Sequence, residues 1–163
     1  MASESEAGSQ VGAGREDVNA ARGDESSDLL GLAKIGIQAF NEKRPELAEF
    51  FIDPDFQFQP FGAVFLGGKT YVGPRGLWEY RDDVDEAFES LIIEPEQYVE
   101  RPGVILIVGT FKAKGRASEI EFEAPYAGVA HFRDNKAISL RTYFELAEAL
   151  EAAGLTADEI DRT

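Results

Sequence analysis

Four strand-like segments fill the second half of the chain, and they constrain its fold more than any other feature. They are rich in β-branched and aromatic residues, and three turn signals separate them: Pro102-Gly103, residues 115–118 and Asp134-Asn135. Connections this short join strands that run antiparallel. The sequence therefore predicts an antiparallel meander over the segments 91–100, 103–115, 118–133 and 136–144.

Helical patterns lie on both sides of this meander. Apolar residues recur at a spacing of three to four, and the third helix carries an apolar stripe of Leu77, Tyr80 or Arg81, and Val84. Ser26 or Ser27 can cap the first helix, and glycine caps the last. The helices are expected over residues 28–43, 44–52, about 74–90 and 145–155, the last ending at Gly154.

Two further strands are expected between the second and third helices. Asp53-Pro54-Asp55 should end the second helix, and "FQFQP" then alternates apolar and polar residues, as a strand with one buried face does. Residues 62–73 look like a hairpin that turns at Gly67-Gly68. Helices and strands are grouped rather than alternating, so the fold class is α+β with a mostly antiparallel sheet. Helices would cover one face of this curved sheet and leave a pocket at its open end.

Charge and cysteine content exclude several classes of function. The formal net charge is −15, so neither nucleic acid nor an anionic membrane is expected as a partner. The chain has no cysteine, which rules out disulfides, thiolate nucleophiles and thiolate metal ligands. Its first thirty residues show no secretory pattern, and no apolar run approaches the roughly 20 residues that span a bilayer. We expect a cytoplasmic protein.

The ends of the chain differ in composition from its centre. Residues 1–27 lack aromatic residues and are rich in Ala, Gly, Ser and acidic residues, which predicts a disordered acidic tail, with an interaction arm as the alternative. Residues 156–163 are expected to form a C-terminal tail. The segment 28–155 is long enough for one domain with a sizeable core.

Several motifs, taken in their order and spacing, resemble the SnoaL-like polyketide cyclase family of the nuclear transport factor 2-like superfamily. They are Tyr71-x-Gly73-x-x-Gly76-Leu77-x-x-Tyr80, then Gly115-Arg116-x-Ser118, then "HFRDNKAISLRTYFELAEALEAAGL". The resemblance spans about residues 28–155. It implies a cone-shaped, curved sheet with an internal cavity, and a homodimer packed through the sheet.

The resemblance also suggests which side chains meet a ligand. Tyr71 and Trp78 would lie near the cavity, where lining and plain core packing remain equal alternatives. Arg116 or His131 would supply polar contacts, with His131 otherwise a half-exposed strand residue. The predicted ligand-binding residues are Tyr71, Trp78, Arg116, Tyr126, His131 and Tyr143.

Alternation along the last two strands predicts which side chains face inward. The set expected at the core or cavity is Ile120, Phe122, Ala124, Tyr126, Ile138, Leu140 and Phe144. The opposite set, expected at solvent, a dimer interface or a polar wall, is Glu119, Glu121, Glu123, Ser139, Arg141 and Tyr143.

The acid and base of ketosteroid isomerases are missing from the matching positions. Gln59 stands where the resemblance places the general-base carboxylate, and Ala130 stands where it places the oxyanion acid. Gly128 and Ala130 also stand where the SnoaL-like pattern often has a histidine and a tryptophan in the penultimate strand. His131 is one position further on, so alternation sends it to the other face unless a bulge intervenes.

Two functions stay open at this stage. One is a cofactor-independent isomerase, cyclase or hydrolase that acts on a small, largely apolar molecule. The alternative is a non-catalytic ligand-binding or dimerisation module that has lost the acid-base residues. No metal site is expected from a single histidine, and no phosphate-loop lysine follows a glycine-rich strand, so no cofactor is expected.

Overall fold

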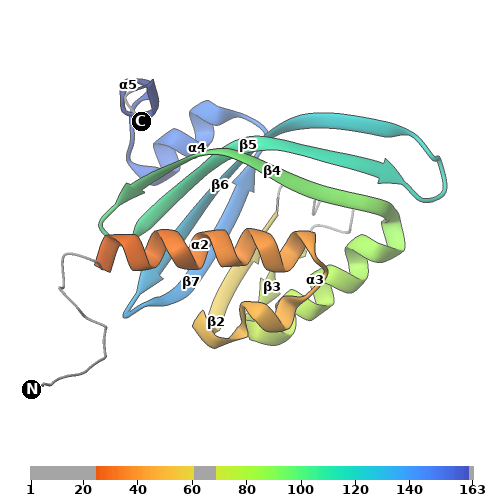
Figure 1. Ribbon diagram of the computed structural model, residues 1–163, viewed down its shortest axis with the longest axis horizontal. Helices are drawn as coiled ribbons and strands as arrows, with labels where there is room; N and C mark the ends of the chain where they lie inside the picture. The colour runs from red at the N-terminus through yellow and green to blue at the C-terminus, as the bar shows by residue number, and fades with distance from the viewer. Residues whose placement is uncertain (1–24, 61–68, 162–163) are drawn as a thin grey trace, which may run out of the picture.

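The computed structural model describes residues 25–60 and 69–161, which form one curved sheet with helices packed against it (Figure 1). The helices are α2 (Glu25–Asn41), α3 (Gly73–Ala87), α4 (Leu146–Ala153) and α5 (Ala157–Asp161), with two 3₁₀ turns, η2 (Pro45–Leu47) and η3 (Glu49–Phe51). The strands are β2 (Ile52–Gln59), β3 (Tyr71–Val72), β4 (Phe88–Arg101), β5 (Val104–Gly115), β6 (Glu121–Arg133) and β7 (Lys136–Tyr143). No described helix is both long and apolar enough to cross a membrane.

The sheet has six strands in the order β3-β2-β7-β6-β5-β4, and it is not closed. Strands β4 to β7 form the predicted meander, with each strand antiparallel to the next. Strand β2 adds to β7 in parallel, and β3 pairs antiparallel with β2. The predicted α+β class with a mostly antiparallel sheet is therefore confirmed.

The sheet bends where β4 carries a bulge opposite a glycine. The register of β4 against β5 shifts between Pro95 and Gln97, and Pro95 pairs with Gly109. A Cβ atom at Gly109 would overlap the carbonyl oxygen of Glu94 and lie 2.9 Å from the Cα atom of Pro95. Only glycine allows so close an approach, and an added residue in one strand increases the local bend.

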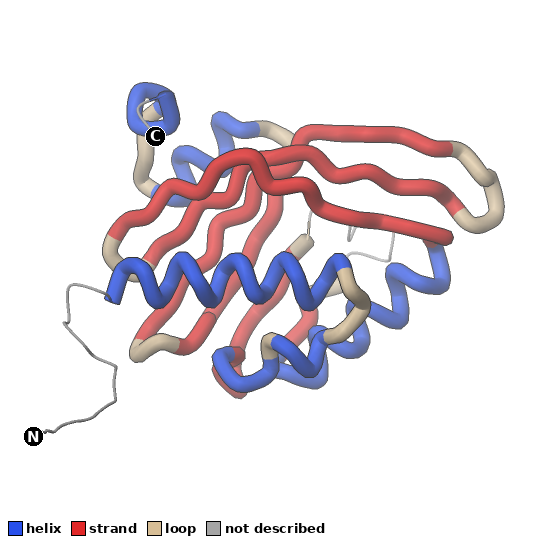
Figure 2. Tube along the Cα trace, viewed as in Figure 1, coloured by secondary structure: helices blue, strands red, loops and turns tan. Residues whose placement is uncertain are grey.

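Helices α2 and α3 cover the inner face of the sheet (Figure 2). The end of α2 is fixed to the edge strand β4 by the side chain of Asn41, which donates to the carbonyl of Ile93 and accepts from its N–H, both at 2.8 Å. This pair satisfies backbone groups on an edge strand that would otherwise lack a partner. The helix thereby lies across the strongly bent part of the sheet.

The opposite face of the sheet carries α4 and α5, a second layer that the sequence analysis did not foresee. Apolar side chains of β4, β5 and β6 pack there against Ala149, Leu150, Leu155 and Ile160. Helix α5 lies within the residues assigned to the C-terminal tail, and Glu159 pairs with Arg101 of β4. Gly154 ends α4 in the left-handed conformation at φ 73°, as its position predicted. The homodimer stays a prediction.

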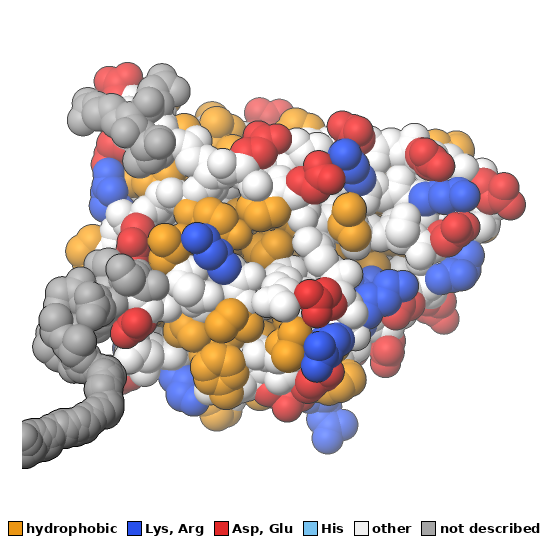
Figure 3. Space-filling model, in the orientation of Figure 1, with side chains coloured by type: hydrophobic (Ala, Val, Ile, Leu, Met, Phe, Trp, Pro, Cys, Tyr) orange, Lys and Arg blue, Asp and Glu red, His pale blue; other side chains and the backbone are white. Residues whose placement is uncertain are grey.

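The charged residues at the far end of the β4–β5 hairpin alternate in sign (Figure 3). Lys112 pairs with Glu94 at 3.2 Å, and Lys114 pairs with Glu89 at 3.6 Å, each across the two strands. Exposed pairs of this kind add little to stability. We assign this end of the molecule to solvent rather than to a ligand.

Some predicted boundaries are wrong, each for a local reason. Residues 44–52 form two 3₁₀ turns rather than one helix, because the chain turns at once into β2. Asp53-Pro54-Asp55 lies inside β2, where the register against β7 shifts between Ile52 and Gln57 and absorbs these turn-forming residues. Helix α3 ends at Ala87 because Phe88 pairs with β5.

Other predictions near the N-terminus and the hairpin are only partly open to comparison. Helix α2 begins at Glu25, before both serines proposed as its cap. The remainder of the predicted tail, residues 1–24, lies outside the described residues. The predicted turn at Gly67-Gly68 also lies outside them.

Glu100 on β4 holds a carboxylate oxygen, Oε2, that is buried without a partner among the described residues. Desolvation raises the pKa of this carboxyl above its ordinary value of 4.5. The folded state therefore holds the proton more tightly than the unfolded chain does. It follows that stability falls as the pH rises through the raised pKa, because the charged form is the costly one in the fold.

Replacing Glu100 with glutamine should raise the free energy of unfolding at pH 7 by about 1 kcal/mol, because the neutral amide removes a buried charge. The gain should shrink toward zero as the pH falls below 4.5, where the wild-type carboxyl is also neutral. Urea denaturation at the two pH values measures this. Glu96→Gln on the same strand is the control, since Glu96 is exposed. A gain that did not change with pH would contradict the assignment.

Candidate functional site

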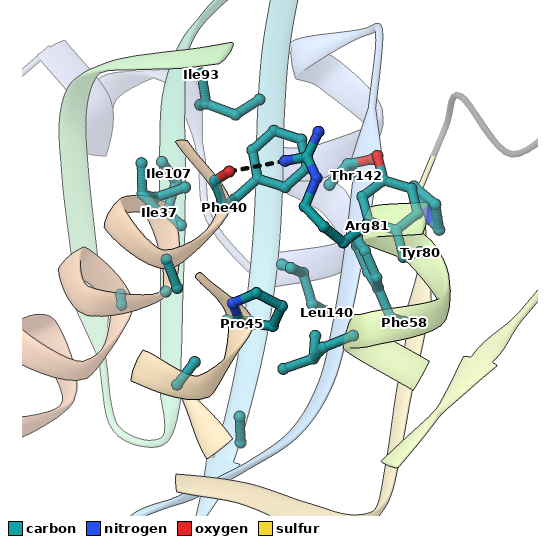
Figure 4. Close-up of a pocket in the computed structure, with 18 of the residues that line it drawn as sticks. Ile37, Phe40, Pro45, Phe58, Tyr80, Arg81, Ile93, Ile107, Leu140 and Thr142 are labelled. Atoms are coloured by element: carbon teal, nitrogen blue, oxygen red, sulfur yellow. Dashed lines mark hydrogen bonds between the residues drawn. The ribbon is translucent and has the colours of Figure 1, made fainter. Parts of the chain in front are cut away.

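A cavity of about 220 Å³ lies between α2, α3 and the inner face of the sheet (Figure 4). Its wall is mostly hydrocarbon, contributed by side chains from both helices, the η turns and five strands. Gly36 and Ile37 of α2, Leu77 of α3 and Leu140 of β7 are among them. Gly36 contributes no side chain to the wall, which leaves space on this side of α2.

The alternation predicted for the last two strands is confirmed for the cavity wall at four positions: Phe122, Tyr126, Leu140 and Phe144 line it. Two positions were wrongly predicted. Ile120 precedes β6 and is 62% exposed. The register of β7 against β6 shifts at Ile138: His131 pairs with Ser139 and Phe132 pairs with Ala137, so Ile138 has no partner residue. Ala137 therefore takes the inward position that was predicted for Ile138.

Arg81 of α3 is the one cationic side chain among the described residues of this wall. Its Nη1 donates to the carbonyl of Phe40 at 2.8 Å, and its Nη2 donates to Asp85 at 3.0 Å. The guanidinium also lies 4.7 Å from the centre of the Phe40 ring. The side chain is only 7% exposed, and its Nε is buried without a hydrogen-bond partner among the described residues.

Two tyrosines give the wall further polar groups. Burial raises the pKa of both Tyr80 and Tyr126, so both phenols stay protonated at neutral pH and can donate a hydrogen bond. A Cβ atom at Gly128 would lie 2.8 Å from the hydroxyl of Tyr126. Gly128 therefore leaves the space along β6 that the Tyr126 ring occupies, and Ala130 beside it keeps the cavity open.

Among the six residues predicted to bind a ligand, Tyr126 lines the cavity. Tyr71 lies next to it in the core, 1% exposed, where its hydroxyl donates to Asp83 at 2.6 Å. This hydrogen bond is the main cause of the lowered pKa of Asp83. Trp78 is 43% exposed on the outer side of α3, and its indole N–H donates to Glu49.

The other three predicted residues lie outside the cavity wall. Arg116 donates to the carbonyls of Asp85 and Phe88, and so ties the β5–β6 turn to the end of α3. His131 lies on the face of β6 opposite Ala130, as alternation predicted, with its Nδ1 3.4 Å from the hydroxyl of Ser139. Tyr143 packs against the outer-face cluster that includes α4.

Sequence reasoning missed Arg81 as a site residue, although one signal was available. The apolar stripe of the third helix passes through Tyr80 or Arg81, so a cation stood at a position facing the core. A buried arginine needs partners, and those partners could not be seen in the sequence. One of them is a backbone carbonyl of α2, which only the tertiary structure brings near.

The wall offers hydrogen-bond donors but no ordinary proton acceptor. No Asp, Glu or His side chain among the described residues lines the cavity. Gln59, proposed at the base position, is exposed and donates to the hydroxyl of Thr70 at 3.3 Å instead. Within the described part of the chain, no group of three or more potential metal ligands comes together.

No sequence-family model matches the chain, and a comparison with curated proteins finds no match. Solved structures do match it. An NTF2-like protein of unknown function from Burkholderia pseudomallei aligns with a TM-score of 0.66 at 16% identity, over 77% of this chain and 97% of that one. TerC, crystallised with polyporic acid, aligns at 0.65 and 17% identity over 77% and 97%. A candidate SnoaL-like polyketide cyclase from Shewanella denitrificans aligns at 0.60 and 14% identity over 77% and 95%.

These likenesses establish that the chain has the nuclear transport factor 2-like fold, which SnoaL-like and ketosteroid isomerase-like proteins share. Because the sequence identities are only 11–18%, these matches establish the fold alone. The resemblance seen in the sequence thus led to the correct fold, and the activity must be argued from the cavity itself.

Proposed function

We propose that this protein binds a small, largely apolar ring compound in the cavity between α2, α3 and the sheet. The observation that carries the proposal is an almost wholly apolar wall with a few hydrogen-bond donors, which is typical of sites for small organic molecules. A cavity of 150 Å³ accepts benzene, so 220 Å³ suits a molecule of about nine non-hydrogen atoms. Such a molecule is one ring with a short substituent, smaller than a steroid.

We place binding before catalysis because the described wall lacks a carboxylate or an imidazole. Proton abstraction at neutral pH needs an acceptor of that kind within hydrogen-bond reach. A cofactor-independent isomerase, cyclase or hydrolase is the second candidate. It is favoured by the donors of Tyr80, Arg81 and Tyr126, which could stabilise a developing negative charge, and by polyketide cyclase candidates among the proteins of this fold.

Two glycines of α2 allow the cavity to be tested by filling it. Gly36 lines the cavity, and a Cβ atom there would meet Phe51 at an ordinary 3.8 Å. Gly31 is not part of the wall, and a Cβ atom there would have no neighbour within 4 Å. Leucine at either position removes a glycine from a helix interior, which favours the helix. Only leucine at position 36 occupies the cavity.

Gly36→Leu should weaken the binding of α-methylstyrene and acetophenone at least tenfold, while Gly31→Leu should leave both affinities within about twofold of wild type. NMR titration of backbone amide resonances measures the dissociation constants directly. Trp78→Ala is a further control, since Trp78 lies outside the wall. Equal binding by the two leucine variants would place the ligand elsewhere. If neither compound bound the wild-type protein at millimolar concentration, the proposed function would fail.

A further inference from the structure

We propose that Arg81 selects ligands that carry an oxygen acceptor, a carbonyl or carboxylate oxygen attached to the ring, and that it binds this oxygen through its Nε–H. The inference rests on the proposed function and names the chemical class that the cavity takes. Arg81 would be the specificity-determining residue of the site. Its role follows from its burial, its partners and the one donor that they leave over.

The position of the guanidinium is fixed from two sides. Arg81 crosses from α3 toward the C-terminal end of α2, where it meets the carbonyl of Phe40 (Figure 4). Asp85, one turn further along α3, holds Nη2 at 3.0 Å. Because both terminal nitrogens of the guanidinium, Nη1 and Nη2, are held by hydrogen bonds, the side chain cannot rotate to turn its Nε–H toward water. A donor that is fixed in this way is preorganised for a ligand.

The Nε–H without a partner destabilises the ligand-free protein, and a ligand that accepts its hydrogen bond would remove this penalty. Buried donors in folded proteins nearly always have a partner, and a donor on a charged group is costly to leave without one. Among the described residues, Nε of Arg81 and Oε2 of Glu100 are the buried side-chain atoms with no partner. Only Arg81 of these two lines the cavity. This Nε has almost no accessible surface, so a ligand oxygen would satisfy it once a neighbouring side chain of the wall moves aside.

The charge around Arg81 is compatible with a neutral or an anionic acceptor. Asp85 offsets the guanidinium, but its side chain is 39% exposed and also pairs with Lys43 at 3.5 Å. The phenols of Tyr80 and Tyr126, which line the same cavity, are donors as well. The guanidinium and the two phenols can all donate to a ligand oxygen, and the Thr142 hydroxyl in the same wall can donate or accept. The rest of the wall favours hydrocarbon.

Three probes of one size and shape test this selection: α-methylstyrene, acetophenone and benzoate. They share a phenyl ring and differ only in whether its substituent carries no oxygen, a carbonyl or a carboxylate. The wild-type protein should bind acetophenone, benzoate or both about tenfold more tightly than α-methylstyrene, the gain expected of a hydrogen bond to a charged donor. Comparing the affinities for acetophenone and benzoate shows whether the site prefers a neutral or an anionic acceptor.

Arg81→Lys should remove most of the preference for oxygen, because lysine keeps the charge and lacks the Nε–H donor. Arg75→Lys, an exposed position on the same helix, should leave it unchanged. Asp85→Asn gives a second readout should Arg81→Lys fail to fold. It leaves Arg81 without its counter-charge, so the affinity for benzoate relative to acetophenone should rise about fivefold or more.

Each outcome decides the matter. Equal binding of all three probes to the wild-type protein would overturn the role of Arg81 and leave the proposed apolar cavity intact. A preference for oxygen that survives in Arg81→Lys, or a relative affinity for benzoate that Asp85→Asn does not change, would also overturn it. If no probe bound, the proposed function itself would fail, which separates the two failures.

Discussion

Gly109→Ala should lower the free energy of unfolding by about 3 kcal/mol, one of the two largest effects expected from a single substitution in this chain. The new Cβ atom would overlap the carbonyl oxygen of Glu94 and crowd the Cα atom of Pro95, both backbone atoms of the neighbouring strand. A side chain could move aside, but here the bulged β4 would have to separate from β5. Urea denaturation followed by circular dichroism measures the loss.

The matched control is Gly31→Ala in α2, where a Cβ atom has no neighbour within 4 Å. That change should raise stability by about 0.5–1 kcal/mol, because alanine loses less conformational entropy than glycine in a helix. A Gly109→Ala variant as stable as wild type would mean that the bulge does not hold the two strands at this distance. The curvature above the cavity would then need another cause.

Tyr71→Ala should cost about 4 kcal/mol, the usual price of deleting a fully buried aromatic side chain. The ring is 1% exposed and lies 5.2 Å from the ring of Tyr80 and 6.2 Å from that of Phe58. Tyr71→Phe keeps this packing and loses only the hydrogen bond to Asp83, for which about 2 kcal/mol is expected. Thermal and urea unfolding of both variants give the two values.

The same pair of variants separates a core role for Tyr71 from a ligand contact. The hydroxyl of Tyr71 is committed to Asp83, and the residue is not part of the cavity wall. Tyr71→Phe should therefore bind α-methylstyrene and acetophenone as the wild type does. A tenfold loss of affinity in a folded Tyr71→Phe variant would return Tyr71 to the site.

Local sequence signals determined the meander and the C-terminal end of α4. Pro102-Gly103 and Asp134-Asn135 form the tight connections that their residue types favour, and Gly154 caps α4. These features depend on a few neighbouring residues, so the pattern alone was sufficient. The helix α4 was predicted, but α5 was missed because Ile160 is the one large apolar residue in a charged segment. Its burial depends on a sheet face that is distant in the sequence.

The candidate site likewise combines features that the sequence predicts with features that depend on tertiary packing. The sequence indicated an apolar cavity without a general base, since Gln59 and Ala130 replace the acid-base residues and Tyr126 faces inward. Which polar group enters that cavity was decided only by tertiary structure. The hydrogen bonds of Arg81 to Phe40 and Asp85 leave its Nε free, and the backbone carbonyl of Phe40 carries no signature of its own in the sequence. Periodicity shows which face a side chain takes, whereas the partner across a cavity is set by how two distant elements pack.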